Sequence, residues 1–198
     1  MKRYDILSLL IKRYNFNSYL EIGVLGRETL NQINVPIKHG VDPNGCGDYT
    51  MTSDEFFANH CKQKYDLIFI DGLHLAEQVQ KDITNSLTFL NEQGIIVCHD
   101  MLPTEEWHQL REGLPGQPWT GDCWKAFANL RAWRHDLKMF TIDTDWGCGV
   151  IKRDDTTWEQ KFIAPVEGWT WDIFKQHRDD IMNVITVEEF LREIGLKE

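Results

Sequence analysis

The sequence offers little cysteine chemistry and no long apolar segment. Its five cysteines are odd in number and widely spaced, and none forms a C-x-x-C pair. Neither a disulfide framework nor a structural zinc site is therefore indicated. No apolar stretch approaches about 20 residues, and the first residues lack the pattern of a signal peptide. We therefore expect a cytoplasmic protein that does not span a membrane.

Basic residues are also in short supply. The chain has 21 Lys and Arg against 31 Asp and Glu, which gives a formal net charge of −10. Binding to nucleic acid or to an anionic membrane surface needs a basic face, and no run of basic residues longer than a pair occurs. The composition thus argues against a nucleic-acid or membrane partner and against a large anionic substrate.

The remaining composition is that of one globular domain. The chain has 198 residues, of which 42% are hydrophobic and 26% charged, with no repeat or low-complexity tract. This length can bury a sizeable core. We predict a ligand-binding domain over 1–153 and a helical C-terminal extension of the same domain over 154–198, with helices near 171–183 and 187–194.

The most informative stretch runs from Tyr19 to Thr29 and predicts a buried strand, a glycine turn and the start of a helix. Gly23 and Gly26 bracket the turn, and glycine lets a ligand approach the backbone closely. A helix that begins after the turn would direct free N–H groups at that ligand. The spacing is G-x-x-G, which lacks the third glycine of a dinucleotide-binding fingerprint. A simple turn between two core elements explains the same residues.

Strand and helix patterns then alternate along the chain, which predicts an α/β fold with a doubly wound, mostly parallel sheet. Pro103, Gly113, Pro115 and other turn-forming residues interrupt this pattern over 101–121. Two strands joined by a short turn follow as an antiparallel hairpin. The predicted strands are 18–22, 37–41, 48–51, 65–70, 95–98, 137–142 and 146–151. The predicted helices of this part of the chain are 4–14, 27–34, 75–90 and 122–135, and a further helix begins near Thr52.

Polar residues recur where these strands end: Glu21, Asp42, Asp71, His99 and Asp100. Open parallel sheets bind ligands at this edge. Asp42 lies about 20 residues after the first turn, where a carboxylate binds ribose hydroxyls in nucleotide-binding folds. Asp42 could instead be an ordinary turn residue. We favour the ligand-binding interpretation.

Taken in order, these segments resemble the class I S-adenosylmethionine-dependent methyltransferases. More narrowly, they resemble the small-molecule O-methyltransferases with a strand that ends in Asp-Gly-x-His. The resemblance covers about 18–152 and implies a Rossmann-like sheet of seven mostly parallel strands with a terminal antiparallel hairpin and helices on both faces. The matching segments are Glu21–Gly26, Val41–Pro43, Thr52–Phe56, Asp66–His74 and Gly94–Asp100.

The resemblance also implies roles for individual residues. Glu21, Gly23 and Gly26 would shape the pocket for the methionine part of S-adenosylmethionine, with Thr29 near its carboxylate. Asp42 would hold the ribose. Ser53 or Asp54 would lie near the adenine, and Asp71 would complete the cofactor-binding set.

In the metal-dependent branch of this family, acidic residues after two neighbouring strands hold a divalent cation. The matching residues here are Asp71, His99 and Asp100, where His99 replaces a more usual acid. Two carboxylates and an imidazole can bind Mg²⁺ weakly and suit Mn²⁺, Fe²⁺ or Zn²⁺ better. His74 matches a general base of some relatives, and Asp71 and His74 form the predicted catalytic pair. A histidine at the start of a helix can equally be a surface residue or a cap.

The leading hypothesis is therefore O-methylation of a hydroxyl on a small molecule or glycan, assisted by Mg²⁺ or Mn²⁺. Two alternatives stay open: a nicotinamide- or nucleotide-dependent enzyme on a similar sheet, and a cofactor-binding module without catalysis. The loop over 101–121 and the C-terminal tail lie outside the resemblance. We expect them to decide substrate choice, or to form a lid or the contact of a homo-oligomer.

Overall fold

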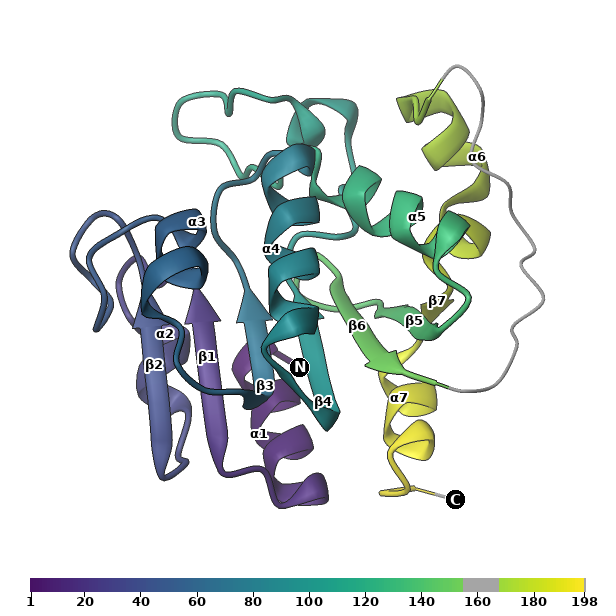
Figure 1. Ribbon diagram of the computed structural model, residues 1–198. Helices are drawn as coiled ribbons and strands as arrows, with labels where there is room; N and C mark the ends of the chain where they lie inside the picture. The colour runs from purple at the N-terminus through teal and green to yellow at the C-terminus, as the bar shows by residue number, and fades with distance from the viewer. Residues whose placement is uncertain (155–167, 198) are drawn as a thin grey trace.

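The computed structural model describes residues 1–154 and 168–197, and these residues form one seven-stranded sheet in the order β2-β1-β3-β4-β6-β5-β7 (Figure 1). The first four strands pair in parallel, and β6 runs antiparallel to both β4 and β5. The predicted α/β fold with a terminal hairpin is therefore confirmed. The strands are β1 (Ser18–Ile22), β2 (Ile37–Val41), β3 (Tyr65–Ile70), β4 (Leu90–Cys98), β5 (Leu137–Ile142), β6 (Cys148–Arg153) and β7 (Val184–Ile185).

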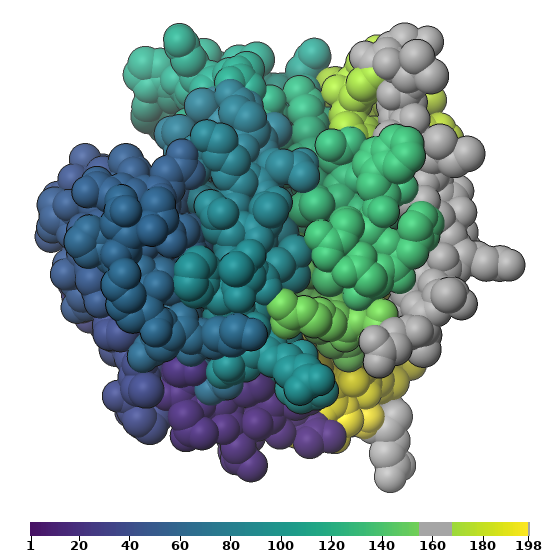
Figure 2. Space-filling view, in the orientation of Figure 1, coloured from purple at the N-terminus to yellow at the C-terminus, as the bar shows by residue number. Residues whose placement is uncertain are grey.

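Helices cover both faces of the sheet. One face carries α3 (Ser53–Glu55), the π-helix η1 (Phe56–His60), α4 (Ala76–Thr88), α5 (Cys123–Trp133) and α6 (Trp171–Met182). The other face carries α1 (Arg3–Tyr14), α2 (Glu28–Gln32) and α7 (Val187–Glu193). Figure 2 shows α4 and α5 as neighbouring ridges on the first face. A short 3₁₀ helix, η2 (Glu106–Gln109), lies in the loop after β4.

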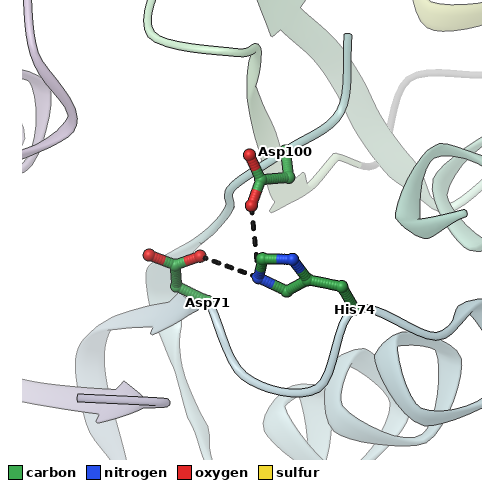
Figure 3. Close-up of side chains that lie close together, drawn as sticks. All are labelled: Asp71, His74 and Asp100. Atoms are coloured by element: carbon green, nitrogen blue, oxygen red, sulfur yellow. Dashed lines mark ion pairs between the residues drawn. The ribbon is translucent and has the colours of Figure 1, made fainter. Parts of the chain in front are cut away.

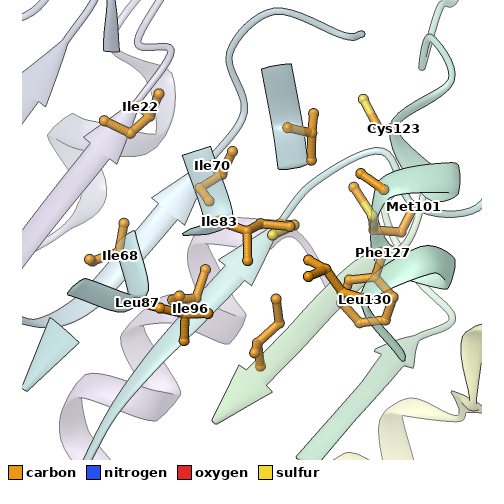
Figure 4. Packing of buried hydrophobic residues seen from close by; sticks show 14 of the residues in the cluster. Ile22, Ile68, Ile70, Ile83, Leu87, Ile96, Met101, Cys123, Phe127 and Leu130 are labelled. Carbon is orange, nitrogen blue, oxygen red and sulfur yellow. The ribbon is translucent and has the colours of Figure 1, made fainter. Parts of the chain in front are cut away.

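The central strands are apolar on both sides because a helical layer packs against each face. Every residue of β1 is buried, as is typical of a strand inside a parallel sheet. Ile83 and Leu87 of α4 lie over Ile68 and Ile96 of the sheet, next to Phe127 of α5 (Figure 4). Their spacing of four residues places them on one face of α4, which explains why the sequence predicted this helix correctly.

One predicted strand does not form. Residues 48–51 make only an isolated bridge between Tyr49 and Val41. Asp48 and Tyr49 instead donate their amides to the carbonyl of Gly40, which folds this segment back as a loop beside the end of β2. The strand predicted over 95–98 is consequently the fourth strand in chain order.

The seventh strand comes from the C-terminal tail. Val184 and Ile185 form β7, which pairs in parallel with β5. Phe190 and Ile194 in and after α7 are buried against the same core cluster as α1. The described part of the tail therefore adds a strand and a helix to the sheet's edge. The earlier part of the predicted extension, 155–167, lies outside the described residues.

The order of the strands creates a switch point in the connections at β1. From β1 the chain moves outward to β2 and then crosses back to β3 on the other side of β1. Ligands of doubly wound sheets bind at such a switch point, beyond the carboxyl ends of the strands. In Figure 1 the ends of β1, β2 and β3 all point to the upper edge, where the loop after β4 also lies. Among the described residues, no helix is long and apolar enough to cross a membrane.

Candidate active site

A cavity of about 730 Å³ opens at this switch point. All eleven residues that the sequence nominated line it: Glu21, Gly23, Gly26, Thr29, Asp42, Ser53, Asp54, Asp71, His74, His99 and Asp100. They come from the ends of β1, β2, β3 and β4 or the turns that follow them, and from the starts of α2 and α3. The fold therefore brings the whole predicted set into one pocket.

Gly23 has a structural reason to be glycine, whereas Gly26 does not. The φ angle of Gly23 is +83°, and a Cβ there would lie 2.1 Å from the carbonyl oxygen of Asp71. The turns after β1 and β3 thus touch through a position that only glycine can occupy. Gly26 has no atom within 4 Å of an added Cβ and no positive φ. Leu25 and Arg27 adopt the left-handed conformations of this turn instead.

Asp42 holds the glycine turn in place. Its Oδ2 accepts hydrogen bonds from the amides of Val24 and Leu25, both at 2.9 Å, and its Oδ1 accepts from the amide of Asn44 at 2.7 Å. Burial raises the pKa of this carboxyl, but the three amides outweigh it and lower the pKa below its usual value. Asp42 is therefore a turn residue that also lines the pocket, so the two interpretations of the sequence are compatible.

Glu21 is a buried acid at the base of the pocket. The hydroxyl of Tyr19 donates to its Oε2 at 2.5 Å, and the side chain has almost no contact with solvent. Burial raises the pKa of Glu21 to about 7, in spite of the tyrosine hydrogen bond. A cationic group that enters the pocket would restore the charged form.

A polar group also lines the pocket near the start of α3. The side-chain amide of Gln78 donates to Ser53, Asp54 and Asp82 at 3.0–3.2 Å. Asp82 was not predicted as a site residue, because in the sequence it is only an acid in an amphipathic helix. It is fully buried, and burial raises the pKa of its carboxyl to about 6.

On the opposite side of the pocket, four side chains form a charged cluster. The Nε2 atom of His74 lies 3.2 Å from Asp100 Oδ2 and 3.6 Å from Asp71 Oδ1 (Figure 3). The Nδ1 atom of His99 lies 3.3 Å from the same oxygen of each aspartate. Two imidazoles therefore face one pair of carboxylates. The sequence predicted these four residues as site residues. It did not predict that His74 lies as close to Asp100 as His99 does.

The cluster shifts the protonation of its members. Burial raises the pKa of Asp71, but the His99 and His74 cations outweigh it and lower that pKa well below its usual range. For His99, burial lowers the pKa, and the Asp71 and Asp100 carboxylates raise it well above its usual value. The pKa of His74 is raised in the same way, by Asp71 and Asp100 against the effect of burial. The two carboxylates therefore favour the protonated form of both imidazoles.

The same donors fit a divalent metal ion. Ligand atoms of Asp71, His74 and Asp100 all lie within 4.8 Å of one another, and His99 contacts both carboxylates. Both ring nitrogens of His99 and the Nδ1 of His74 are buried without a hydrogen-bond partner in the described part of the chain. Oxygen and imidazole donors together suit Mn²⁺, Fe²⁺ or Zn²⁺. The grouped donors include two of the three predicted metal ligands, Asp71 and Asp100, together with His74, while His99 lies beside them at 3.3 Å from both carboxylates.

Several solved structures share this fold. The O-methyltransferase TomG from Streptomyces achromogenes, in complex with SAM, aligns with a TM-score of 0.55 and 15% identity over 76% of this chain and 79% of its own. An O-methyltransferase from Bacillus cereus in complex with SAH gives 0.56 and 14% over 76% and 80%. The SAH-bound methyltransferase PaMTH1 from Podospora anserina gives 0.50 and 17% over 77% and 78%. No curated protein sequence matches the chain.

A family model described as a methyltransferase domain matches residues 39–101. That range begins in β2 and ends after β4, so it contains Asp42 and all four members of the charged cluster. The match covers about a third of the chain, and the solved structures show that the fold of the chain is that of these methyltransferases. The matched segment supplies most of the residues that line the pocket.

Two residues that sequence reasoning missed reach the charged cluster from other parts of the chain. Arg3, the first residue of α1, places its Nε 3.7 Å from Asp71 and 3.0 Å from Thr29 Oγ1. Asp145, in the turn between β5 and β6, lies 3.6 Å from Nε2 of His99. No pattern in the sequence pointed to Arg3, and Asp145 was predicted only to lie in the turn of the hairpin.

The loop over 101–121 packs against the pocket beside His74. A Cβ on Gly121 (φ +60°) would lie 1.8 Å from the carbonyl oxygen of His74. The Trp119 ring lies 4.8 Å from the His74 ring, at 36° to it. The loop therefore packs directly on the residue predicted to be the base.

Proposed function

We propose that this chain transfers the methyl group of S-adenosylmethionine to a hydroxyl oxygen of a small molecule, with a divalent metal ion at Asp71, His99 and Asp100. A single observation carries the proposal. One pocket holds the glycine turn with Asp42 on one side and the carboxylate–imidazole cluster on the other. The solved O-methyltransferases of the same fold, two of which contain SAM or SAH, support the same assignment.

The cofactor half is formed by the turn after β1. Glu21, Gly23 and Thr29 line the pocket and would hold the methionine part, and Gly23 leaves the backbone there without a side chain. Asp42 would hold the ribose, and Ser53 or Asp54 would contact the adenine; all three also line the pocket. When bound, S-adenosylmethionine supplies an electrophilic methyl group on a sulfonium.

The acceptor half is formed by the cluster. When bound, the metal ion lowers the pKa of a hydroxyl that it contacts. His74 takes the hydroxyl proton on Nε2, the nitrogen that faces both carboxylates. Asp71 and Asp100 stabilise the imidazolium that results, and holding the acceptor in line with the methyl group supplies much of the remaining rate enhancement.

The acceptor itself is a hydroxyl of a small molecule or glycan. The acidic composition of the chain argues against a large polyanionic acceptor. Substrate choice falls to the loop over 101–121, which contacts His74 through Gly121 and Trp119. We place the chain in the cytoplasm and expect either a monomer or a homo-oligomer.

The test is calorimetric titration of S-adenosylhomocysteine, with NAD⁺ as the control ligand and with Mn²⁺ or Mg²⁺ present or absent. We expect saturable binding of S-adenosylhomocysteine alone and an additional, separable binding event for Mn²⁺. Asp42→Ala should weaken S-adenosylhomocysteine binding at least tenfold, because the glycine turn loses two of its hydrogen bonds (roughly 1 kcal/mol each).

Asp48→Ala is the matched control. Asp48 lies in the same loop and accepts from the amide of Gly40, but it does not line the pocket. Its loss should leave S-adenosylhomocysteine affinity unchanged. Binding of NAD⁺ instead would favour the nucleotide-dependent alternative. Cofactor binding without methyl transfer, across a broad panel of hydroxyl acceptors and metals, would favour the binding module.

A further inference from the structure

The turn between β5 and β6 contains an acid in an unusual backbone conformation. Asp145, Trp146 and Gly147 have φ angles of +47°, +64° and +88°, a run of three left-handed residues. Left-handed non-glycine residues cost about 1 kcal/mol each, so the surrounding structure must impose them. The amides of Met101 and Leu102 donate to the carbonyls of Gly147 and Trp146, at 3.1 and 2.7 Å. The turn is thus attached to the segment that follows Asp100.

The side chain of Asp145 is 2% exposed and is shared among three partners. Its Oδ2 accepts from the amide of Arg3 at 2.9 Å and from the Arg3 guanidinium at 3.2 Å, and its Oδ1 accepts from Lys2 at 3.0 Å. The same Oδ2 lies 3.6 Å from Nε2 of His99. A buried carboxylate therefore stands behind the His99 ring, on the side away from Asp71 and Asp100.

Carboxylates therefore face both nitrogens of the His99 ring. Its Nδ1 lies 3.3 Å from Asp71 and from Asp100, while its Nε2 points to Asp145. An imidazole that binds a metal through one nitrogen commonly donates its other N–H to a carboxylate, and this partner fixes the ring and its tautomer. Asp145 lies on that side of the ring at ion-pair distance, 3.6 Å from Nε2, and comes from the turn between β5 and β6, not from the strands that supply the cluster.

We infer that Asp145 is a positioning residue that directs Nδ1 of His99 at the metal site between Asp71 and Asp100. The inference rests on the metal site of the proposed function. Through Arg3, which also reaches Asp71 and Thr29, Asp145 ties the N-terminal helix to both halves of the pocket. The hairpin turn, not only the strand ends, thereby determines how strongly the cluster holds a cation.

The experiment titrates Mn²⁺ into the full chain and its variants and follows the free Mn²⁺ signal by electron paramagnetic resonance. Asp145→Gly removes the side chain and relieves the left-handed backbone, so the turn can keep its shape. We expect its Mn²⁺ affinity to fall by about 10- to 100-fold. Asp145→Asn tolerates the same φ and keeps an oxygen toward Arg3 and His99, with its amide turned to the exposed Lys2. This variant should bind Mn²⁺ within about threefold of the original chain, because a side-chain oxygen still faces Nε2 of His99.

Thr144→Ala is the matched control in the same turn. Thr144 Oγ1 donates to the carbonyl of Met1 and so holds the N-terminus without contacting His99. It should leave Mn²⁺ affinity unchanged. Equal losses in Thr144→Ala and Asp145→Gly would overturn the inference and indicate a purely structural turn. Equal losses in Asp145→Asn and Asp145→Gly would also overturn it, because charge and not alignment would then be the cause.

Binding of S-adenosylhomocysteine is measured on every variant and separates this inference from the proposed function. Asp145 does not line the pocket, so the affinity for S-adenosylhomocysteine should not change. A chain that binds S-adenosylhomocysteine but no Mn²⁺ contradicts the role of Asp145 while leaving the cofactor assignment intact. A chain that binds Mn²⁺ in the expected order of variants but no S-adenosylhomocysteine supports Asp145 and contradicts the cofactor assignment.

Discussion

The two sides of the pocket are held by different kinds of contact. On the side of β1 and β2, most contacts involve the backbone: Gly23 lies against the carbonyl of Asp71, and Asp42 accepts hydrogen bonds from main-chain amides. On the side of β3 and β4, side chains contact side chains, with two imidazoles facing two carboxylates. Backbone contacts depend on shape and tolerate almost no added atom, whereas the charged cluster depends on protonation and on ions.

This difference predicts that the first side is sensitive to volume and the second to pH and metal. The strongest test is Gly23→Ala. The strain of a left-handed alanine and the overlap with the Asp71 carbonyl should together lower the free energy of unfolding by about 4 kcal/mol. Urea denaturation measures the change. Gly26→Ala, in the same turn but with open space around it, should change the free energy of unfolding by less than about 0.5 kcal/mol. Equal effects would remove the distinction between the two glycines.

The second prediction concerns Glu21, a titratable group on the backbone-dominated side. Its pKa is raised to about 7 in the folded chain from 4.5, so the unfolded chain loses this proton first as the pH rises. The free energy of unfolding should therefore fall between about pH 4.5 and 7, by up to about 3 kcal/mol from this group. Glu21→Gln cannot titrate, and the difference between the two stability profiles should show this fall. A constant difference across that range would contradict the burial of an ionisable Glu21.

The smallest predicted effect belongs to the charged side. Asp71→Asn leaves His74 and His99 facing one carboxylate, and should lower the free energy of unfolding of the metal-free chain by about 2 kcal/mol. Both histidines have raised pKa values, so their pairing stabilises the fold below pH 6.5 and is lost as the pH rises through the folded values. The loss in Asp71→Asn should therefore be larger at pH 6 than at pH 9.

Asp54→Asn is the control for this variant. Asp54 lines the same pocket but is exposed and pairs with Lys81 at the surface. Its free energy of unfolding should change by less than about 0.5 kcal/mol at either pH. A loss in Asp71→Asn that is independent of pH would mean that packing, and not charge pairing, makes Asp71 important to stability.

Local sequence determined much of the fold because its signals are short-range. Alternating strand and helix patterns predicted five of the strands to within two residues, and α4 followed from the four-residue spacing of Ile83 and Leu87. The strand predicted over 95–98 begins earlier, at Leu90, where the end of the preceding helix was predicted. The site residues at strand ends were also predictable, since parallel strands bring their carboxyl ends to one edge whatever the loops do. Gly23 and Asp42 lie within this logic, and both line the pocket.

Tertiary structure decided what depends on contacts between distant segments. Residues 48–51 do not form a strand, because the amides of Asp48 and Tyr49 donate to the carbonyl of Gly40. The seventh strand, β7, forms instead where the C-terminal tail pairs with β5. Arg3 and Asp145 are separated by 142 positions, yet the Asp145 carboxylate accepts a hydrogen bond from Arg3 and also lies beside His99. The sequence by itself determined the strand-end chemistry of the pocket. Only the folded chain determined which distant charged residues contact those strand-end side chains, because side-chain pairing between distant segments produces no periodic pattern in the sequence.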